Sequence, residues 1–344
     1  MNQASSGRAP SAPKAKFWKS PMVRLGGCAL ILGLLFAFLP FGQIWAGIRR
    51  IPVSLSIGLL CFYMVLHLLG VVKWRMLINV AGAGLAFGQA VRCYYGGLFG
   101  NVFLPSLVGG DVVRGALAFP VSRSKAAVVM GSVIDRAQDV LGLGTVAAIG
   151  VLLLPQSLNP QSRRVFWTFG GALAVVGLVT LGILFTLPVR KFPFKVRRIL
   201  AKLRHAARAM AGHWGTVLLC LVLGMILQVT QVGINYWLGL ATGLKIGFGV
   251  WLFAWPLAKI SALLPVTQGG IGVREVALVA LLAPFGAASA LTAAAGLVFE
   301  AITTIGGLIA GIIAFLVGRI APPQPMPRSG VPALQREGGA VPAE

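Results

Sequence analysis

Long apolar runs, separated by short basic or glycine-rich segments, make up most of this chain. A helix needs about 20 apolar residues to cross a bilayer, and several runs reach that length. The runs are continuous and do not alternate with polar positions, so they predict helices and not the strands of a barrel. We therefore expect an all-α, polytopic membrane protein with about eight spans. The predicted spans are 22–43, 52–72, 86–104, 126–154, 165–187, 214–238, 248–264 and 288–318.

The two ends of the chain lack this apolar character. Residues 1–20 are small, polar and basic, and residues 321–344 are rich in proline, so both are expected to be disordered tails. Between them, residues 21–320 are expected to form one transmembrane domain in two halves. The halves and the basic cytoplasmic loop that joins them are predicted at about 21–187, 209–320 and 188–208.

One short motif occurs in both halves, 160 positions apart. It reads LPSLVGGDVVR at 104–114 and LPVTQGGIGVR at 264–274, with six of eleven positions identical. Interrupted apolar segments at corresponding points of two halves indicate the binding site of a membrane transporter. We therefore predict two re-entrant broken-helix elements related as an inverted repeat. Short apolar pieces at 112–119 and 275–286 follow the two motifs.

The residue types of the motif favour an anion-binding site. The proline stops the incoming helix, and the glycine pair permits positive φ and a close approach of the backbone. A helix that begins there presents free N–H groups and a positive dipole end, and arginine suits bidentate contact with phosphate. The alternative is a tight turn between helices whose arginines extend to the membrane interface. The predicted headgroup-binding residues are Asn101, Gly109, Gly110, Arg114, Gly269, Gly270 and Arg274.

Five of the seven acidic residues lie in or beside the predicted spans. Ionisable groups are costly there, and they are usually paired or functional. Asp111 and Arg114, at i,i+3, can pair, and Asp135 and Asp139, at i,i+4, share a helix face. Glu300 has two interpretations: a salt bridge to Arg274 or Arg136, or a gating or proton-linked role. The predicted gating or ion-pair residues are Asp111, Asp135, Arg136, Asp139, Glu275 and Glu300.

Three intramembrane amides, Gln228, Gln231 and Asn235, recur at i, i+3 and i+7 on one helix face. Hydrogen bonds between helices are the favoured role for such groups, ahead of lining a path through the protein.

Composition and charge agree with a membrane protein. The chain is 57% hydrophobic and 11% charged, against about 25% charged in soluble domains. Its net charge of +23 lies between the apolar runs and at the ends, as in the cytoplasmic segments of membrane proteins, and no soluble basic domain for nucleic acid is apparent. We expect a multi-pass protein of the cell (inner) membrane with both termini cytoplasmic. Lys73 and Arg75 are taken as the cytoplasmic end of the second span. The first motif then enters from the cytoplasm and the second from outside.

No pattern for catalysis is found in the sequence. The four cysteines and three histidines are scattered without metal or disulfide spacing. A phosphate loop, a GxSxG elbow and an HExxH pair are all missing. We therefore expect no catalytic residue, no metal and no cofactor, and a protein that is not an enzyme.

Three segments resemble one known family: NVFLPSLVGGDVVRGAL at 101–117, AAVVMGSVIDRAQDVLGL at 126–143 and LLPVTQGGIGVREVALVALLAPFG at 263–286. They are similar to the lysylphosphatidylglycerol synthase transmembrane region, also called the flippase-like family, and the likeness extends from about 20 to 318. The resemblance implies a module that moves lipids between leaflets. In full-length aminoacyl-lipid synthases it accompanies a cytosolic transferase domain, which this sequence lacks, so lysyl transfer is not expected. The matched positions are Asp111, Arg114, Asp135, Arg136, Pro265, Gly269, Gly270, Gly272, Arg274 and Glu275.

The expected function is translocation of a lipid with an anionic or polar headgroup: a phospholipid, an aminoacyl-phospholipid or a lipid-linked sugar. One alternative is an integral membrane transferase with Asp111 or Asp135 as acid or base. Another is a partner subunit for a separately encoded lipid-modifying enzyme. Membrane lipids, foremost anionic ones, are the expected partners, nucleic acid is not, and a homo-oligomer is left open.

Overall fold

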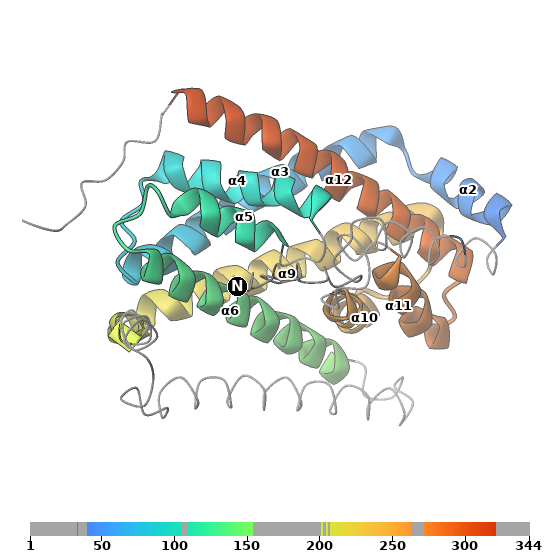
Figure 1. The fold of residues 1–344 in the computed structure, drawn as a ribbon. Helices are drawn as coiled ribbons and strands as arrows, with labels where there is room; N and C mark the ends of the chain where they lie inside the picture. The colour runs from blue at the N-terminus through green and yellow to red at the C-terminus, as the bar shows by residue number, and fades with distance from the viewer. Residues whose placement is uncertain are drawn as a thin grey trace, which may run out of the picture.

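Every regular element that the computed structural model describes is a helix (Figure 1). The structure describes residues 33, 40–104, 109–153, 201, 204–205, 207–262 and 272–320. The prediction of an all-α chain is therefore confirmed for this part. The elements are α2 (Phe41–Arg50), α3 (Val53–Val80), α4 (Phe87–Phe103), α5 (Gly109–Ala118), α6 (Lys125–Leu153), α9 (Trp214–Thr242), α10 (Phe248–Ser261), α11 (Val273–Leu282), the 3-10 turn η3 (Ala283–Phe285) and α12 (Ser289–Ile320).

Several predictions lie outside the described residues. They are the two tails, the span at 165–187, nearly all of the span at 22–43 and most of the basic loop at 188–208, together with Gly269 and Gly270.

Four described helices, α3, α6, α9 and α12, are long and apolar enough to cross a membrane. In the most apolar 18 residues of each helix only 28–33% of the residues are buried inside the protein, so most of them are at least partly exposed. A water-soluble protein rarely exposes so large an apolar surface, whereas lipid covers it readily. The chain is a multi-pass membrane protein. The total of eight spans and the inverted repeat stay predictions.

The end of α3 corrects one expectation. The second span is predicted to stop at 72, with Lys73 and Arg75 at its cytoplasmic end, but α3 continues to Val80 and buries Lys73. The lysine Nζ lies 2.5 Å from Asp139 Oδ1 of α6. A hydropathy pattern ends a span at the first charge, because it cannot register a partner on another helix. Arg75 does lie near the helix end, where its Nε donates to the Leu85 carbonyl at 2.9 Å.

Each repeated motif joins a longer helix to a ten-residue helix that packs back on it. The pairs are α4 with α5, and α10 with α11. Gly110 and Gly97 are at the closest approach of the first pair: a Cβ on Gly97 would lie 2.8 Å from the Gly110 carbonyl oxygen. The expected close backbone approach is thus confirmed. The glycine pair of the first motif is helical and does not have positive φ; among the described motif glycines, Gly272 has it, at 85°.

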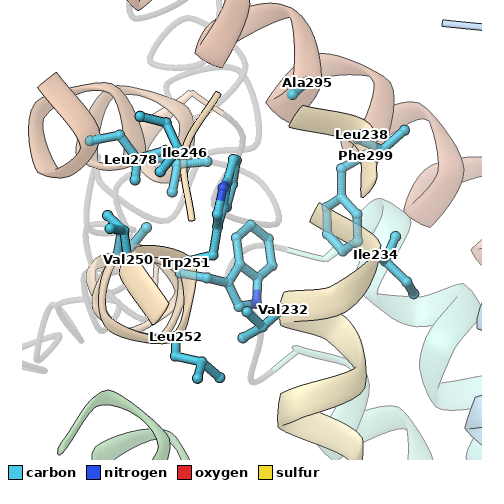
Figure 2. Close-up of a cluster of buried hydrophobic side chains, with 14 of the residues drawn as sticks. Val232, Ile234, Leu238, Ile246, Val250, Trp251, Leu252, Leu278, Ala295 and Phe299 are labelled. Atoms are coloured by element: carbon cyan, nitrogen blue, oxygen red, sulfur yellow. The ribbon is translucent and has the colours of Figure 1, made fainter. Parts of the chain in front are cut away.

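The two larger of three buried hydrophobic clusters hold most of the described helices together. The first contains residues of α9, α10, α11 and α12 around Trp251, as Figure 2 shows. The second contains residues of α3, α4 and α6 around Trp74. The longest helix, α12, runs along α4 and α2 (Figure 1) and has residues in both clusters. The polar site described next lies where the two clusters meet.

Candidate functional site

A cavity of about 200 Å³ lies inside the helix assembly and contains most of the charged residues predicted to be functional. We call it the central cavity. Eight helices contribute to it: α3, α4, α5, α6, α9, α10, α11 and α12. Charged groups at membrane depth are costly, so their collection in one place calls for a specific chemical arrangement. The charged lining residues are Lys73, Asp111, Arg114, Asp135, Arg136, Asp139, Lys259, Arg274 and Glu300.

The arginine of the first motif is surrounded by acids and aromatic rings. Arg114 Nη2 donates to Asp135 Oδ2 at 2.9 Å and lies 3.0 Å from Asp111 Oδ1. The centre of the guanidinium lies 4.8 Å from the ring centroid of Trp74 and 5.2 Å from that of Tyr94, within cation–π range. The predicted pairing of Asp111 with Arg114 is confirmed.

Two further cations complete this arrangement. Lys73 Nζ lies 3.0 Å from Asp135 Oδ1 as well as close to Asp139, so the two aspartates do share a helix face. Arg136 pairs with Asp111. Three cations and three carboxylates therefore neutralise one another. This first ion-pair group consists of Lys73, Arg114, Arg136, Asp111, Asp135 and Asp139.

The arginine of the second motif has a matching environment, which we call the second ion-pair group. Arg274 Nη2 donates to Glu275 Oε1 at 2.9 Å and also bonds Glu300. Its guanidinium lies 5.3 Å from the Trp255 ring and 5.0 Å from the Phe299 ring. Of the two interpretations of Glu300, the salt bridge to Arg274 is confirmed, and the gating role stays a prediction.

The two acids on each arginine differ in exposure. In the first group Asp135 is 6% exposed and Asp111 22%; in the second group Glu275 is 1% exposed and Glu300 17%. We call Asp135 and Glu275 the inner acids, and Asp111 and Glu300 the outer acids. Each arginine thus has one fixed carboxylate and one that borders open space.

The backbone amides at the starts of the two short helices already have partners. The Gly110 amide donates to Asn101 Oδ1 at 2.8 Å, and the Gly272 amide donates to Glu275 Oε2 at 2.7 Å. Asn101 and Gly110 line the central cavity, whereas Gly109 and Glu275 are not among the lining residues. The first motif therefore brings an arginine to the cavity, while its Gly110 amide is capped by the protein itself.

Lys259 is a charged residue of the cavity that the sequence patterns did not single out. Its Nζ donates to Gln228 Oε1 at 2.9 Å and to Gln231 Oε1 at 2.5 Å, so the two glutamines both join α9 to α10 and line the cavity. The cost of a charge within an apolar run, applied above to the acidic residues, applies equally to this lysine and would have identified it. Asn235 differs: its amide donates to the Gln231 carbonyl within α9.

Five cations and four carboxylates line the cavity, and a fifth carboxylate, Glu275, is paired with Arg274 outside the lining. The charges therefore balance as a whole but not locally: Arg274 has two carboxylates, whereas Lys259 has none within 4.0 Å among the described residues. A buried cation without a directly paired carboxylate favours an anion beside it, since burying an unpaired charge is costly.

The charged residues of the central cavity lie in a segment that matches a known protein family. Residues 22–311 match the family model described as the lysylphosphatidylglycerol synthase TM region. The matched segment includes every charged lining residue of the central cavity. A comparison with curated proteins gives no match.

Proposed function

Because the chain belongs to the family of lysylphosphatidylglycerol synthase transmembrane regions, we propose that it moves a lipid with an anionic or polar headgroup between the leaflets of a membrane. Membership of this family associates the chain with lipid modification or transport at a membrane. One observation supports translocation in particular: a charged cavity lined by helices whose outer surfaces are apolar.

The obstacle to lipid translocation is the headgroup, because polar groups lose their hydrogen bonds to water in the hydrocarbon layer. The central cavity offers replacement partners within the protein, and its volume of about 200 Å³ admits a small headgroup or several waters. The acyl chains remain outside, on the apolar faces of the long helices. The protein thereby lowers the cost of the polar part alone.

The outer acids, Asp111 and Glu300, can act as a gate for the headgroup. A headgroup phosphate can take the place of Asp111 on Arg114, or of Glu300 on Arg274, while the inner acid keeps each guanidinium in position. Arginine forms bidentate contacts with phosphate as readily as with carboxylate, so the exchange replaces one anion with another of similar geometry. The two arginines would contact the headgroup in turn.

This proposal includes no catalytic step, metal or cofactor, and it places the protein in the cell (inner) membrane with both termini cytoplasmic. The transferase alternative needs Asp111 or Asp135 as a free acid or base. Both carboxylates are paired with Arg114, at 3.0 and 2.9 Å, which disfavours that role. A transferase would change the lipid composition of a membrane when the purified chain is supplied with substrates, whereas a translocase would change only the distribution between leaflets.

The test is reconstitution of the full chain in vesicles that contain a headgroup-labelled fluorescent phospholipid, with a membrane-impermeant quencher added outside. Wild-type protein should make the inner-leaflet label accessible, whereas empty vesicles should keep the inner-leaflet label, about half of the total, protected. The double variant Arg114→Ala, Arg274→Ala should lose this activity. Unchanged translocation in the double variant would remove both arginines from the mechanism.

A further inference from the structure

Lys259 differs from every other cation in the lining of the central cavity. Lys73, Arg114, Arg136 and Arg274 each have a carboxylate within 4.0 Å, whereas Lys259 has none among the described residues. Its two bonds go to the neutral amide oxygens of glutamines. They orient the ammonium group without neutralising it, and an ammonium group has three donors to satisfy. Among the described cations of the lining, Lys259 is thus the one without a directly paired carboxylate.

Other buried donors border the same space. Trp255 lies one turn before Lys259 on α10, and its Nε1 has no hydrogen-bond partner among the described residues. The same holds for Arg114 Nε and for His67 Nε2. Native proteins leave few buried polar atoms unpaired, because each costs about 1–3 kcal/mol. Two certain donors, and a cation without a directly paired carboxylate, border this cavity and favour an occupant that is rich in acceptors and negatively charged.

Lys259 lines the same cavity as residues of both ion-pair groups. Trp255 connects it to the second group directly, because the Trp255 ring also stacks on Arg274. A group bound at Lys259 is therefore within the same cavity as both motif arginines.

We propose that Lys259 and Trp255 form the phosphate-binding site of the central cavity, with Gln228 and Gln231 orienting the lysine. The ammonium group and the indole N–H donate to oxygens of one phosphate group, as charge-assisted and neutral hydrogen bonds respectively. The motif arginines are already paired with carboxylates. The headgroup then contacts one of them before it binds at Lys259 and the other after it leaves. The inference rests on the proposed function only for the source of the phosphate, a lipid headgroup.

Binding to the purified full chain in detergent tests the site apart from transport. The probes are dihexanoyl phosphatidylglycerol, dihexanoylglycerol, which has the same chains without phosphate, and inorganic phosphate. Lys259→Gln should weaken binding of the phospholipid about tenfold or more, since a hydrogen bond to a charged group is lost. Lys259→Arg should retain most of the affinity. Lys245→Gln removes an exposed lysine outside the cavity and should leave affinity unchanged.

Trp255→Phe keeps an aromatic ring over Arg274 and removes the indole donor, so it should weaken binding of the phospholipid about threefold or more. This variant also keeps the inference testable if Lys259→Gln does not fold, which the unfolding temperature and elution volume report. Equal affinity of wild type and Lys259→Gln for the phospholipid would overturn the site, as would equal affinity of wild type for dihexanoylglycerol.

Inorganic phosphate distinguishes the two sources of the ligand. Competition with the phospholipid that disappears in Lys259→Gln identifies the free ion as an occupant and supports phosphate recognition at this lysine. Competition that persists in the variant contradicts it. The vesicle assay separates the two proposals: lysine-dependent binding without wild-type translocation rejects the proposed function alone, and wild-type translocation with lysine-independent binding rejects this inference alone.

Discussion

Arg114 and Arg274 are 160 positions apart in the sequence, and both guanidinium groups line one cavity. Each is paired with two carboxylates and flanked by two aromatic rings. The repeated motif therefore has a common structural result in both halves: a short helix that presents a compensated arginine to the same enclosed space.

The inner acids should be important for stability. Asp135→Asn removes the negative partner of both Arg114 and Lys73, and breaking a buried ion pair costs about 3–5 kcal/mol. Asp111→Asn should cost less, because Asp111 is the more exposed acid of the pair. Thermal unfolding of the two purified variants in detergent measures the difference. A larger loss for Asp111→Asn would contradict the assignment of inner and outer acids.

The outer acids should control release of the headgroup. In a variant with Asp111→Asn and Glu300→Gln, the arginines keep their inner acids but lose the competitor for phosphate. The short-chain phospholipid should then bind several-fold more tightly, and vesicle translocation should slow about tenfold, which is a change of about 1.4 kcal/mol in barrier. Faster translocation together with weaker binding would reject a gating role for these acids.

The close approach of α4 and α5 should be intolerant of any side chain. A Cβ on Gly110 would overlap the Gly97 carbonyl oxygen and the Asn101 side chain, so Gly110→Ala should destabilise the protein by about 1–3 kcal/mol. Gly115 lies in the same helix with nothing within 4 Å of the corresponding position. Gly115→Ala is the matched control and should be neutral or stabilising by up to about 1 kcal/mol, because alanine favours a helix. Equal unfolding temperatures for the two variants would show that the helices can separate without cost.

The inverted repeat can be tested by labelling from the two sides of the membrane. Single cysteines are introduced by Ser122→Cys, after α5, and Ala288→Cys, after η3, in a background without the four native cysteines. A membrane-impermeant thiol reagent should reach the first position only from the cytoplasm and the second only from outside. Labelling of both from one side would reject the opposite orientation of the two motifs.

Local relationships could be predicted from the sequence, whereas distant ones could at most be named as alternatives, as with the salt bridge of Glu300 to Arg274 or Arg136. The spacing of Asp111 and Arg114 determines that they can pair, since residues three apart are neighbours on any helix. The contacts of Lys73 with Asp139 and of Arg274 with Glu300 depend on which helix faces meet, and the period of a single helix contains no such information.

The same limit explains the two lysines. A hydropathy pattern treats every charge as a boundary or an exception, so it ends the second span at Lys73 and does not single out Lys259. Both lie inside helices because side chains of other helices provide oxygens for them. The apolar runs are enough to predict where the helices lie in the sequence. Which side chains line the cavity depends on how all of these helices pack together.

The doubled acids of each arginine have an energetic consequence for transport. A cation with a single counter-ion would have to lose that counter-ion before it could bind an anionic headgroup. In a medium of low polarity this step would dominate the barrier to transport. A cation with two counter-ions exchanges one anion for another and is never uncompensated. Passage of a headgroup through such a protein is then a series of exchanges of one anion for another on each arginine. Its rate depends on how similar the affinities of the carboxylate and the phosphate for that arginine are.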